Sequence, residues 1–259
     1  MNTLKVEQHS NGILQITLNR PEKLNALNGE LLNELQQTIN TARDEKKVKA
    51  LLLTGEGQKS FCAGADINRL AELNAQQGLE FAEQGQAVFR SLEQLAKPSL
   101  AAINGYAFGG GCELAMSATM RIASSNAQFG QPEVKLGVIP GYGGTQRLAR
   151  LIGKGRALGL CLTGRTIKAE DALAWGLISE ITNLEDLIPR AQEILLELIA
   201  LAPLALTSVM KVIDAGYDLS LADALHLEAV HFGCLCASHD KNEGVNAFLQ
   251  KRKAEFKGN

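Results

Sequence analysis

Cysteine is sparse in this chain: there are five among 259 residues, an odd number with no disulfide-framework spacing. Such usage favours a reducing compartment, and we expect a cytoplasmic protein. Long apolar runs are also missing. The first residues, MNTLKVEQHSNG, contain no apolar segment of the signal-peptide kind, and no run reaches membrane-spanning length. We therefore expect neither export nor a membrane partner.

Charge of one sign is not in excess either. The formal net charge is −2 at pH 7, so no overall basic field attracts nucleic acid or anionic lipid. Tandem repeats are not recognisable by identity. What is present is an ordinary globular composition, 46% hydrophobic and 21% charged, in a chain long enough for one large domain with a sizeable core.

The pattern of apolar residues predicts alternating strands and helices. Period-two alternation over residues 14–18 indicates a half-buried strand, and helical spacing of leucine and isoleucine covers 27–39. The run VKALLLTG, residues 48–55, is typical of a buried strand, and residues 75–95 have a helical pattern. One further strand is predicted over 99–108, leading into three glycines. This order of strand, glycine turn and helix indicates α/β architecture.

From about residue 184 onward the pattern predicts helices only. Four amphipathic segments follow one another with Gly, Pro or Asp between them: residues 184–201, 203–215, 220–232 and 242–256. No flexible linker precedes them. We therefore expect this part to pack on the core or on a neighbouring subunit.

The glycine triplet at 109–111 does not match the phosphate-binding loops. A Walker loop needs Gly-Lys followed by Ser or Thr, whereas the only Gly-Lys pair, Gly153-Lys154, is followed by glycine. The dinucleotide fingerprint fails because Leu114 stands where its third glycine should be. What remains is a helix N-terminus with unobstructed amides, and two such amides can hold an oxyanion.

Two acids lie close to these small-residue segments in sequence. Glu113 follows the triplet, and Glu133 comes twenty residues later, in a turn after Pro132. The stretch SFCAGADI again allows a ligand to approach the backbone. One acid and one base beside an oxyanion site can move protons next to a carbonyl. Each feature also has a simpler explanation. The glycine triplet can serve close helix–strand packing, Glu113 can complement the helix dipole, and Glu133 can be a solvated turn residue. Spacing alone does not show that the three segments meet.

Six segments, in order along almost the whole chain, resemble the crotonase superfamily and within it the short-chain enoyl-CoA hydratases. They are LNRPEKLNAL, FCAGADI, NGYAFGGGCELAM, FGQPEVKLGVIPGYGGTQRLARLIG, LTGRTIKAEDALAWGLISEI and HDKNEGVNAFLQKRK. The resemblance implies an α/β fold, a crotonase-like spiral of ββα units over residues 1–195 that holds the active site. It further implies an all-helical trimerisation region over 196–259, a homo-hexamer built as a dimer of trimers, and acyl thioesters of coenzyme A as substrates.

The resemblance also assigns roles to individual residues. The backbone amides of Ala65 and Gly110 would form the oxyanion hole for the thioester oxygen. Glu113 would take a proton from water as its oxygen attacks Cβ, and Glu133 would deliver a proton to Cα. The expected reaction is hydration of trans-2-enoyl-CoA to 3-hydroxyacyl-CoA, with no metal and no separate cofactor, since coenzyme A is part of the substrate.

Contacts to the substrate and its coenzyme A moiety are carried over in the same way. The residues expected to make them are Ala63, Ala65, Asp66, Ile67, Asn68, Gly110 and Lys23. Many relatives have lysine where this chain has Asn68. Lys251 or Lys253 of a neighbouring subunit would also reach the phosphates. The segment from Leu70 to about Phe89 is expected to form the wall that limits acyl length, which the sequence itself leaves open.

Three other interpretations are weighed against this one. A Δ3,Δ2-enoyl-CoA isomerase would need only the acid at Glu133, and relatives of that kind commonly lack the first acid. RNA binding by a crotonase relative would use a basic cluster, but acids interrupt the one formed by Arg43, Lys46, Lys47 and Lys49. A metal site is not expected, because no zinc template fits His226, His231, Cys234, Cys236 and His239. Cys62 and Cys112 are interpreted as packing residues.

Overall fold

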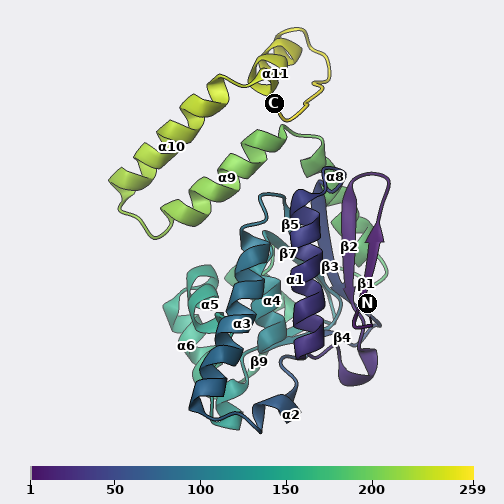
Figure 1. Cartoon of the computed structure of the whole chain (residues 1–259), viewed down its shortest axis with the longest axis vertical. Helices are drawn as coiled ribbons and strands as arrows, with labels where there is room; N and C mark the ends of the chain where they lie inside the picture. The colour runs from purple at the N-terminus through teal and green to yellow at the C-terminus, as the bar shows by residue number, and fades with distance from the viewer. Residues whose placement is uncertain (1) are drawn as a thin grey trace.

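The computed structural model describes residues 2–259 and contains two β-sheets (Figure 1). The larger has the order β1-β2-β3-β5-β7-β10, with β1 antiparallel to β2 and parallel pairing elsewhere. Its strands are Leu4–Gln8, Ile13–Leu18, Ala50–Gly55, Ser99–Ile103, Met120–Ser124 and Glu180–Thr182. The smaller has the order β4-β6-β8-β9, formed by Ser60–Cys62, Tyr106–Phe108, Gln128–Gly130 and Thr166–Lys168.

Three times in succession the chain contributes one strand to each sheet and then a helix. β3 and β4 precede α3, β5 and β6 precede α4, and β7 and β8 precede α5. The helices of this part are α1 Gly29–Asp44, α2 Ile67–Leu70, α3 Ala75–Glu93, α4 Gly110–Ser117, α5 Gly144–Ile152, α6 Lys154–Thr163 and α7 Ala169–Trp175. Two short 3₁₀ helices, η1 Pro21–Lys23 and η2 Glu133–Leu136, interrupt the loops. The expected spiral of ββα units is confirmed.

The single strand predicted over 99–108 is wrong, because the chain bends at Asn104 and Gly105 and supplies one strand to each sheet. Asn104 stabilises the bend: its side-chain amide donates to the carbonyl oxygens of Gly55, 2.8 Å, and Gly57, 2.6 Å. A side chain at position 105 would stand 2.3 Å from the Lys59 carbonyl oxygen. Only glycine permits so close an approach of two backbones.

The first predicted helix begins two residues later than its apolar pattern indicates. Asn28 caps α1 by accepting a hydrogen bond from the Leu31 amide at 2.9 Å. Leu27 is not helical; its amide donates to the Gly64 carbonyl oxygen at 2.8 Å, which joins this segment to the loop after β4. The residues just before α1 are therefore hydrogen-bonded to the loop after β4, which contains Ala65.

Helix α8, Leu187–Ile199, covers the face of the large sheet opposite to α1 and α3. Its buried side chains, including Leu187, Ala191 and Leu195, pack in one cluster with Ile13, Leu52 and Leu100 of three strands. A domain boundary after residue 195 falls inside this helix. The division into 1–195 and 196–259 stays a prediction.

Helices α9 Pro203–Gly216, α10 Leu221–Cys236 and α11 His239–Leu249 form what we call the C-terminal arm (residues 203–249), which extends away from the sheets (Figure 1). Neither α9 nor α10 contains a fully buried residue. The last helix is shorter than predicted, because Lys251 adopts a positive φ of 54° and the chain turns back. Asp240 then accepts hydrogen bonds from the amides of Lys257 and Gly258, each 2.7 Å.

Among residues 2–259, no single helix has the length and apolar character needed to cross a membrane. Only α8 and α9 taken together, with a bend of 105° between them, reach that length and composition.

Candidate active site

A cavity of about 540 Å³ lies where the strand ends of the small sheet meet α2, α3 and the loop before α5. Its polar end is lined by Ala63, Gly64, Ala65, Gly109, Gly110, Glu113 and Glu133. Its apolar part is lined by Leu70, Leu73, Phe81, Ala82, Ile139 and Tyr142, among others. The three segments that the sequence left unconnected therefore surround one space, and the segment after Leu70 lies along it as expected.

Two backbone amides lie close together at the polar end. β4 and β6 are parallel neighbours, so the loops that follow them, with Ala65 and Gly110, leave the sheet at the same edge. A Cβ atom built on Gly110 would stand 3.4 Å from the Ala65 nitrogen. Within residues 2–259 neither amide donates a hydrogen bond. Gly110 is the first residue of α4, and the bridge between Ala65 and Leu27 uses the Gly64 carbonyl oxygen and the Asp66 amide instead. Both are available to an oxygen of a ligand.

The outer two glycines of the triplet are required for different reasons. Gly109 has a φ of +49°, and a Cβ atom there would lie 2.5 Å from Oε1 of Glu133. At Gly111 a Cβ atom would lie 2.0 Å from the Cys62 carbonyl oxygen. The bare backbone thus allows an acid to approach from one side and β4 from the other.

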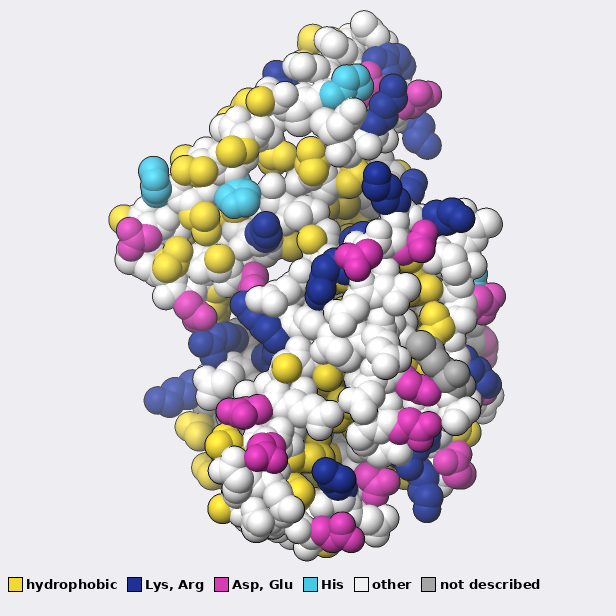
Figure 2. Space-filling model, in the orientation of Figure 1, with side chains coloured by type: hydrophobic (Ala, Val, Ile, Leu, Met, Phe, Trp, Pro, Cys, Tyr) yellow, Lys and Arg dark blue, Asp and Glu magenta, His cyan; other side chains and the backbone are white. Residues whose placement is uncertain are grey.

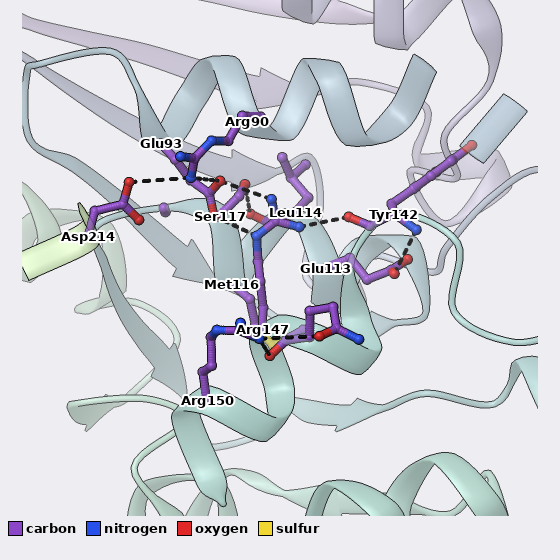
Figure 3. Close-up of polar contacts among 12 residues, drawn as sticks. Arg90, Glu93, Glu113, Leu114, Met116, Ser117, Tyr142, Arg147, Arg150 and Asp214 are labelled. Carbon is purple, nitrogen blue, oxygen red and sulfur yellow. Dashed lines mark hydrogen bonds and ion pairs between the residues drawn. The ribbon is translucent and has the colours of Figure 1, made fainter. Parts of the chain in front are cut away.

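Glu113 is almost completely buried, with 1% of its surface exposed, and its carboxylate is held by two backbone amides. Its Oε1 accepts hydrogen bonds from the amides of Tyr142, 2.8 Å, and Gly144, 2.6 Å; Figure 3 shows the Tyr142 nitrogen facing the carboxylate. Gly144 is the first residue of α5, so its amide is one that the helix leaves free. No side chain or amide in residues 2–259 donates to Oε2 of Glu113. That oxygen remains free to take a proton.

Glu133 begins η2 and is partly exposed to the cavity. The buried Gln131, with its amide nitrogen turned toward the acid, donates to Oε1 at 3.1 Å and to Oε2 at 3.2 Å. This side-chain amide fixes the direction of the carboxyl group, while Gly109 leaves room beside it.

Both acids have an altered affinity for protons. Burial, followed by the negative charge of Glu133, raises the pKa of Glu113 to about 7. Burial also raises the pKa of Glu133 to about 7. Two coupled acids release their protons in two macroscopic steps, and between these steps the pair holds one proton. One acid and one base then stand beside two open amides.

The structure brings together most of the residues that the sequence predicted for the site. Ala63 and Ile67 line the cavity with Ala65, Gly110 and both acids. Asp66 and Asn68 do not line it. Asp66 caps α2, accepting from the Asn68 amide at 3.2 Å, and pairs with Arg20 at 3.4 Å.

Lys23 is exposed at the end of η1, outside the cavity. Its neighbour Leu24 accepts a hydrogen bond from the Ala63 amide at 3.0 Å, so this segment runs beside the loop of Ala65. The coenzyme A contacts of Lys23, Asp66 and Asn68 stay predictions.

Sequence reasoning missed the groups that orient the two acids. The amides of Tyr142 and Gly144 belong to the segment GYGGTQRL, whose paired glycines were the available signal for close backbone contact. The partner of Glu133, Gln131, stands two residues before it and carries no such signal. The contacts of Glu113 span 29 and 31 residues and exist only in the folded chain.

Cys62 and Cys112 are buried next to the site. Burial raises the pKa of the Cys62 thiol to about 12 and raises that of Cys112 as well. Both thiols therefore stay protonated, as packing residues do. Across residues 2–259 no three side chains of His, Cys, Asp or Glu are grouped so that they could hold a metal ion.

Comparison with known proteins agrees with this geometry. A family model described as enoyl-CoA hydratase/isomerase matches residues 8–259. The chain is 46% identical over 240 residues to a short-chain-enoyl-CoA hydratase of Clostridium acetobutylicum, covering 93% of this chain and 92% of that protein. A crotonyl-CoA hydratase of Syntrophomonas wolfei is 44% identical over 239 residues, 92% of each chain. The crystal structure of enoyl-CoA hydratase from Bacillus anthracis has a TM-score of 0.95 at 36% identity, covering 99% of this chain and 100% of that one.

The fold and the site together define the class of protein. It is an enzyme built on a spiral of ββα units, with two open amides and two acids on one cavity. The chain belongs to the enoyl-CoA hydratase/isomerase family. Its resemblance to the crotonase superfamily is thereby confirmed, and so is the expected fold with a helical C-terminal part.

Proposed function

We propose that this protein is an enoyl-CoA hydratase, which adds water across the double bond of a trans-2-enoyl-CoA to give the 3-hydroxyacyl-CoA. The observation that carries the proposal is the single cavity on which Glu113, Glu133 and the free amides of Ala65 and Gly110 converge. The names of the two relatives described above support the same reaction and a short acyl chain.

The amides of Ala65 and Gly110 bind the thioester oxygen. Their hydrogen bonds strengthen as negative charge develops on that oxygen, and removing one donor of this kind typically costs roughly 10²–10³ in rate. Polarisation of the thioester draws electron density from the conjugated double bond, so Cβ becomes open to attack by water. No metal and no separate cofactor is needed in this proposal, because the two amides supply the electrophilic assistance.

The two acids complete the addition. Glu113 in its ionised form takes a proton from water through its free Oε2 while the water oxygen bonds to Cβ. Glu133 in its protonated form gives a proton to Cα of the resulting enolate. The pair ends with its proton moved from Glu133 to Glu113, and a proton exchange with solvent restores it. Each acid–base group is expected to contribute about 10²–10⁴ in rate.

Other features of the substrate complex follow from the same proposal. The apolar part of the cavity holds the acyl chain in this proposal. We propose that Lys23, Asp66 and Asn68 contact the coenzyme A moiety where it leaves the cavity. We propose a homo-hexamer formed as a dimer of trimers, supported by the exposed apolar side chains of the C-terminal arm. Lys251 or Lys253 of a neighbouring subunit would then reach the phosphates. A cytoplasmic location stays a prediction from cysteine usage.

Incubation of the purified protein with crotonyl-CoA in D₂O tests the proposed reaction. Hydration predicts loss of the conjugated-enoyl absorbance, a product heavier by one water, and deuterium at Cα, with no change when a chelator is added. A 3-enoyl-CoA that is converted to the 2-enoyl isomer, without hydration of crotonyl-CoA, would favour the isomerase alternative instead. Glu113→Gln and Glu133→Gln should each lower the hydration rate by orders of magnitude; an unchanged rate removes that residue from the mechanism.

A further inference from the structure

The loop that holds Glu113 has little rigidity of its own. Gly141, Gly143 and Gly144 surround Tyr142, and Gly143 adopts a φ of +107°. Glycine-rich backbone has many conformations of similar energy, so an external contact must select the one in which the Tyr142 and Gly144 amides point the same way. The packing of the Tyr142 ring is one such contact. A second contact acts on its carbonyl group.

That second contact comes from Arg147, one turn into α5. Its Nη1 donates to the Tyr142 carbonyl oxygen at 2.7 Å. The guanidinium group lies directly over Gly143, where a Cβ atom would stand 2.1 Å from Nη1 and would displace it. Figure 3 shows Arg147 between Glu93 and the segment that carries Tyr142.

The guanidinium group is itself fixed by Glu93, the last residue of α3. Nε of Arg147 donates to Oε1 of Glu93 at 2.5 Å, and Nη2 donates to Oε2 at 3.0 Å. The two side chains are only 16% and 18% exposed, so the pair is shielded from solvent more than an ordinary surface ion pair. A bidentate pair of this kind sets orientation as well as position.

We propose that Arg147, held by Glu93, is a positioning residue for the base Glu113. It fixes the Tyr142 carbonyl group and thereby aims the amides of Tyr142 and Gly144 at Oε1 of Glu113. Neither Arg147 nor Glu93 lines the cavity, so the pair acts on the acid through the loop and not on the substrate. The inference rests on the proposed function, in which Glu113 is the base.

The amide hydrogen bonds favour the charged form of Glu113, and so, to a smaller extent, does the positive charge of Arg147 itself. If the loop relaxes, these bonds weaken and the carboxylate holds its proton more tightly. The other ionisable groups near Glu113 are unchanged by a substitution at Arg147; they are Cys112 in α4, Glu133 in η2, Tyr142 in the loop and Cys161 in α6. The activity that depends on ionised Glu113 should therefore move to higher pH.

Arg147→Lys separates position from charge, because it keeps the positive charge but loses the planar group that reaches Glu93 and Tyr142 together. We expect kcat for crotonyl-CoA to fall by roughly 10–10²-fold, KM to stay the same, and the acid limb of the pH profile to shift upward. Arg150→Lys is the matched control one turn further along α5; Arg150 pairs with Asp218 at the surface, and its variant should behave as the wild type.

Glu93→Gln breaks the same ion pair by changing its acidic member. It should also lower kcat and shift the acid limb to higher pH. Combined with Arg147→Lys it should add little, because both substitutions break one unit. Infrared titration of ¹³C-carboxyl-labelled glutamate, with Glu113 assigned by its loss in Glu113→Gln, measures the protonation of Glu113 without any turnover.

An upward shift in both the infrared titration and the acid limb supports the inference. Arg147→Lys with wild-type kcat and titration overturns it. So does a variant that loses activity and thermal stability while its Glu113 titration stays in place, since that outcome describes a purely structural ion pair. If the wild type does not hydrate crotonyl-CoA, the proposed function fails, and the infrared titration still decides whether Arg147 positions Glu113.

Discussion

At the scale of single residues, the space beside Gly109 decides where Glu133 can stand. A methyl group at position 109 would meet Oε1 of Glu133 at 2.5 Å, and the φ of +49° disfavours any side chain there. The carboxyl group is the mobile end of a side chain, so it would move and the fold would persist. We expect Gly109→Ala to lower kcat by about 10²-fold. Gly155→Ala, in open space on α6, is the control, and its activity should not change. Steady-state kinetics with equal circular dichroism of both variants would decide this; full activity of Gly109→Ala would contradict it.

The titration of the acid pair predicts a bell-shaped pH profile. The pKa values of Glu113 and Glu133 are both raised to about 7. Below the first macroscopic pKa the pair carries two protons and Glu113 cannot act as the base. Above the second it carries none and Glu133 cannot act as the acid. The profile of kcat/KM should therefore have its maximum near pH 7 and fall by tenfold per pH unit on each side. A flat profile between pH 5 and pH 9 would contradict a role for both acids.

The same raised pKa values predict a cost in stability at neutral and higher pH. A buried carboxyl whose pKa rises on folding binds more protons in the folded state, so stability decreases as the pH rises from its ordinary pKa to the raised one. Glu133→Gln removes this charge. We expect it to increase the free energy of unfolding at pH 8 on the order of 1–3 kcal/mol, and to have little effect near pH 4.5. Denaturant titrations at both pH values measure this; equal effects at both would show that burial of the charge is not the cause.

Residue types and spacing singled out the two acids and the small-residue segments as candidates. The roles of Glu113, Glu133 and the amides of Ala65 and Gly110 came from the resemblance to the crotonase superfamily. Neither the spacing nor the resemblance predicted how the acids are oriented. Tyr142 and Gly144 contact Glu113 through main-chain atoms, and any residue but proline has the same amide, so the sequence carries no trace of the bond. The role of Asp66 as the cap of α2 was also hidden, because a capping acid and a ligand-binding acid have the same side chain.

At the scale of elements, α3 and the loop before α5 together shape the apolar part of the cavity. The Tyr142 ring lies against Phe81, with ring centres 5.2 Å apart, and against Phe89 at 5.5 Å. It fits because position 85 is glycine; a Cβ atom there would be 2.2 Å from the ring. The ring therefore closes the space that α3 leaves open, which fits a short acyl chain.

Replacing this ring should alter the preference for acyl length. We expect Tyr142→Ala to raise kcat/KM for decenoyl-CoA relative to crotonyl-CoA by roughly tenfold or more, since one or two methylene groups are worth about 1–3 kcal/mol in an apolar pocket. Tyr142→Phe is the control. It removes a buried hydroxyl group with no partner within residues 2–259, so preference should not change and stability should not fall. A panel of enoyl thioesters gives the ratios, and equal ratios in all three proteins would contradict the assignment of Tyr142.

Apolar periodicity predicted α3, α8, α9 and α10 to within about four residues, whereas α11 ends at Leu249, well before the predicted end at residue 256. The periodicity failed where neighbouring strands belong to different sheets. Residues 99–108 contain the turn dipeptide Asn104-Gly105, but the apolar residues on both sides were interpreted as one strand. The two residues produce the bend through contacts with the end of β3 and the start of β4. Which strands pair with each other likewise depends on contacts between residues far apart in the sequence.

At the scale of the whole molecule, the C-terminal arm has an apolar surface that the described chain does not cover. Hydrophobic side chains gather over it in Figure 2, and Leu225, Phe232 and Phe248 are 55%, 69% and 83% exposed. An exposed apolar surface of this extent is typical of a subunit interface. It supports the proposed assembly.

A charge placed on this surface should disrupt the assembly without unfolding the subunit. We expect Leu225→Glu with Phe232→Glu to convert the oligomer to a species near the chain mass of 27.8 kDa, with an unchanged helical signal. Val6→Glu, the same kind of change on the outer strand β1, should leave the mass alone. Light scattering coupled to size-exclusion chromatography measures both. A wild type that is already monomeric would contradict the proposed hexamer and trimer alike.

A crystal structure of the protein with acetoacetyl-CoA, which cannot be hydrated, is the most direct measurement. The account predicts the thioester oxygen within hydrogen-bonding distance, roughly 2.7–3.1 Å, of the Ala65 and Gly110 nitrogens. Glu113 should then face Cβ and Glu133 should face Cα. An acyl group bound elsewhere, or one whose oxygen contacts neither amide, would contradict it.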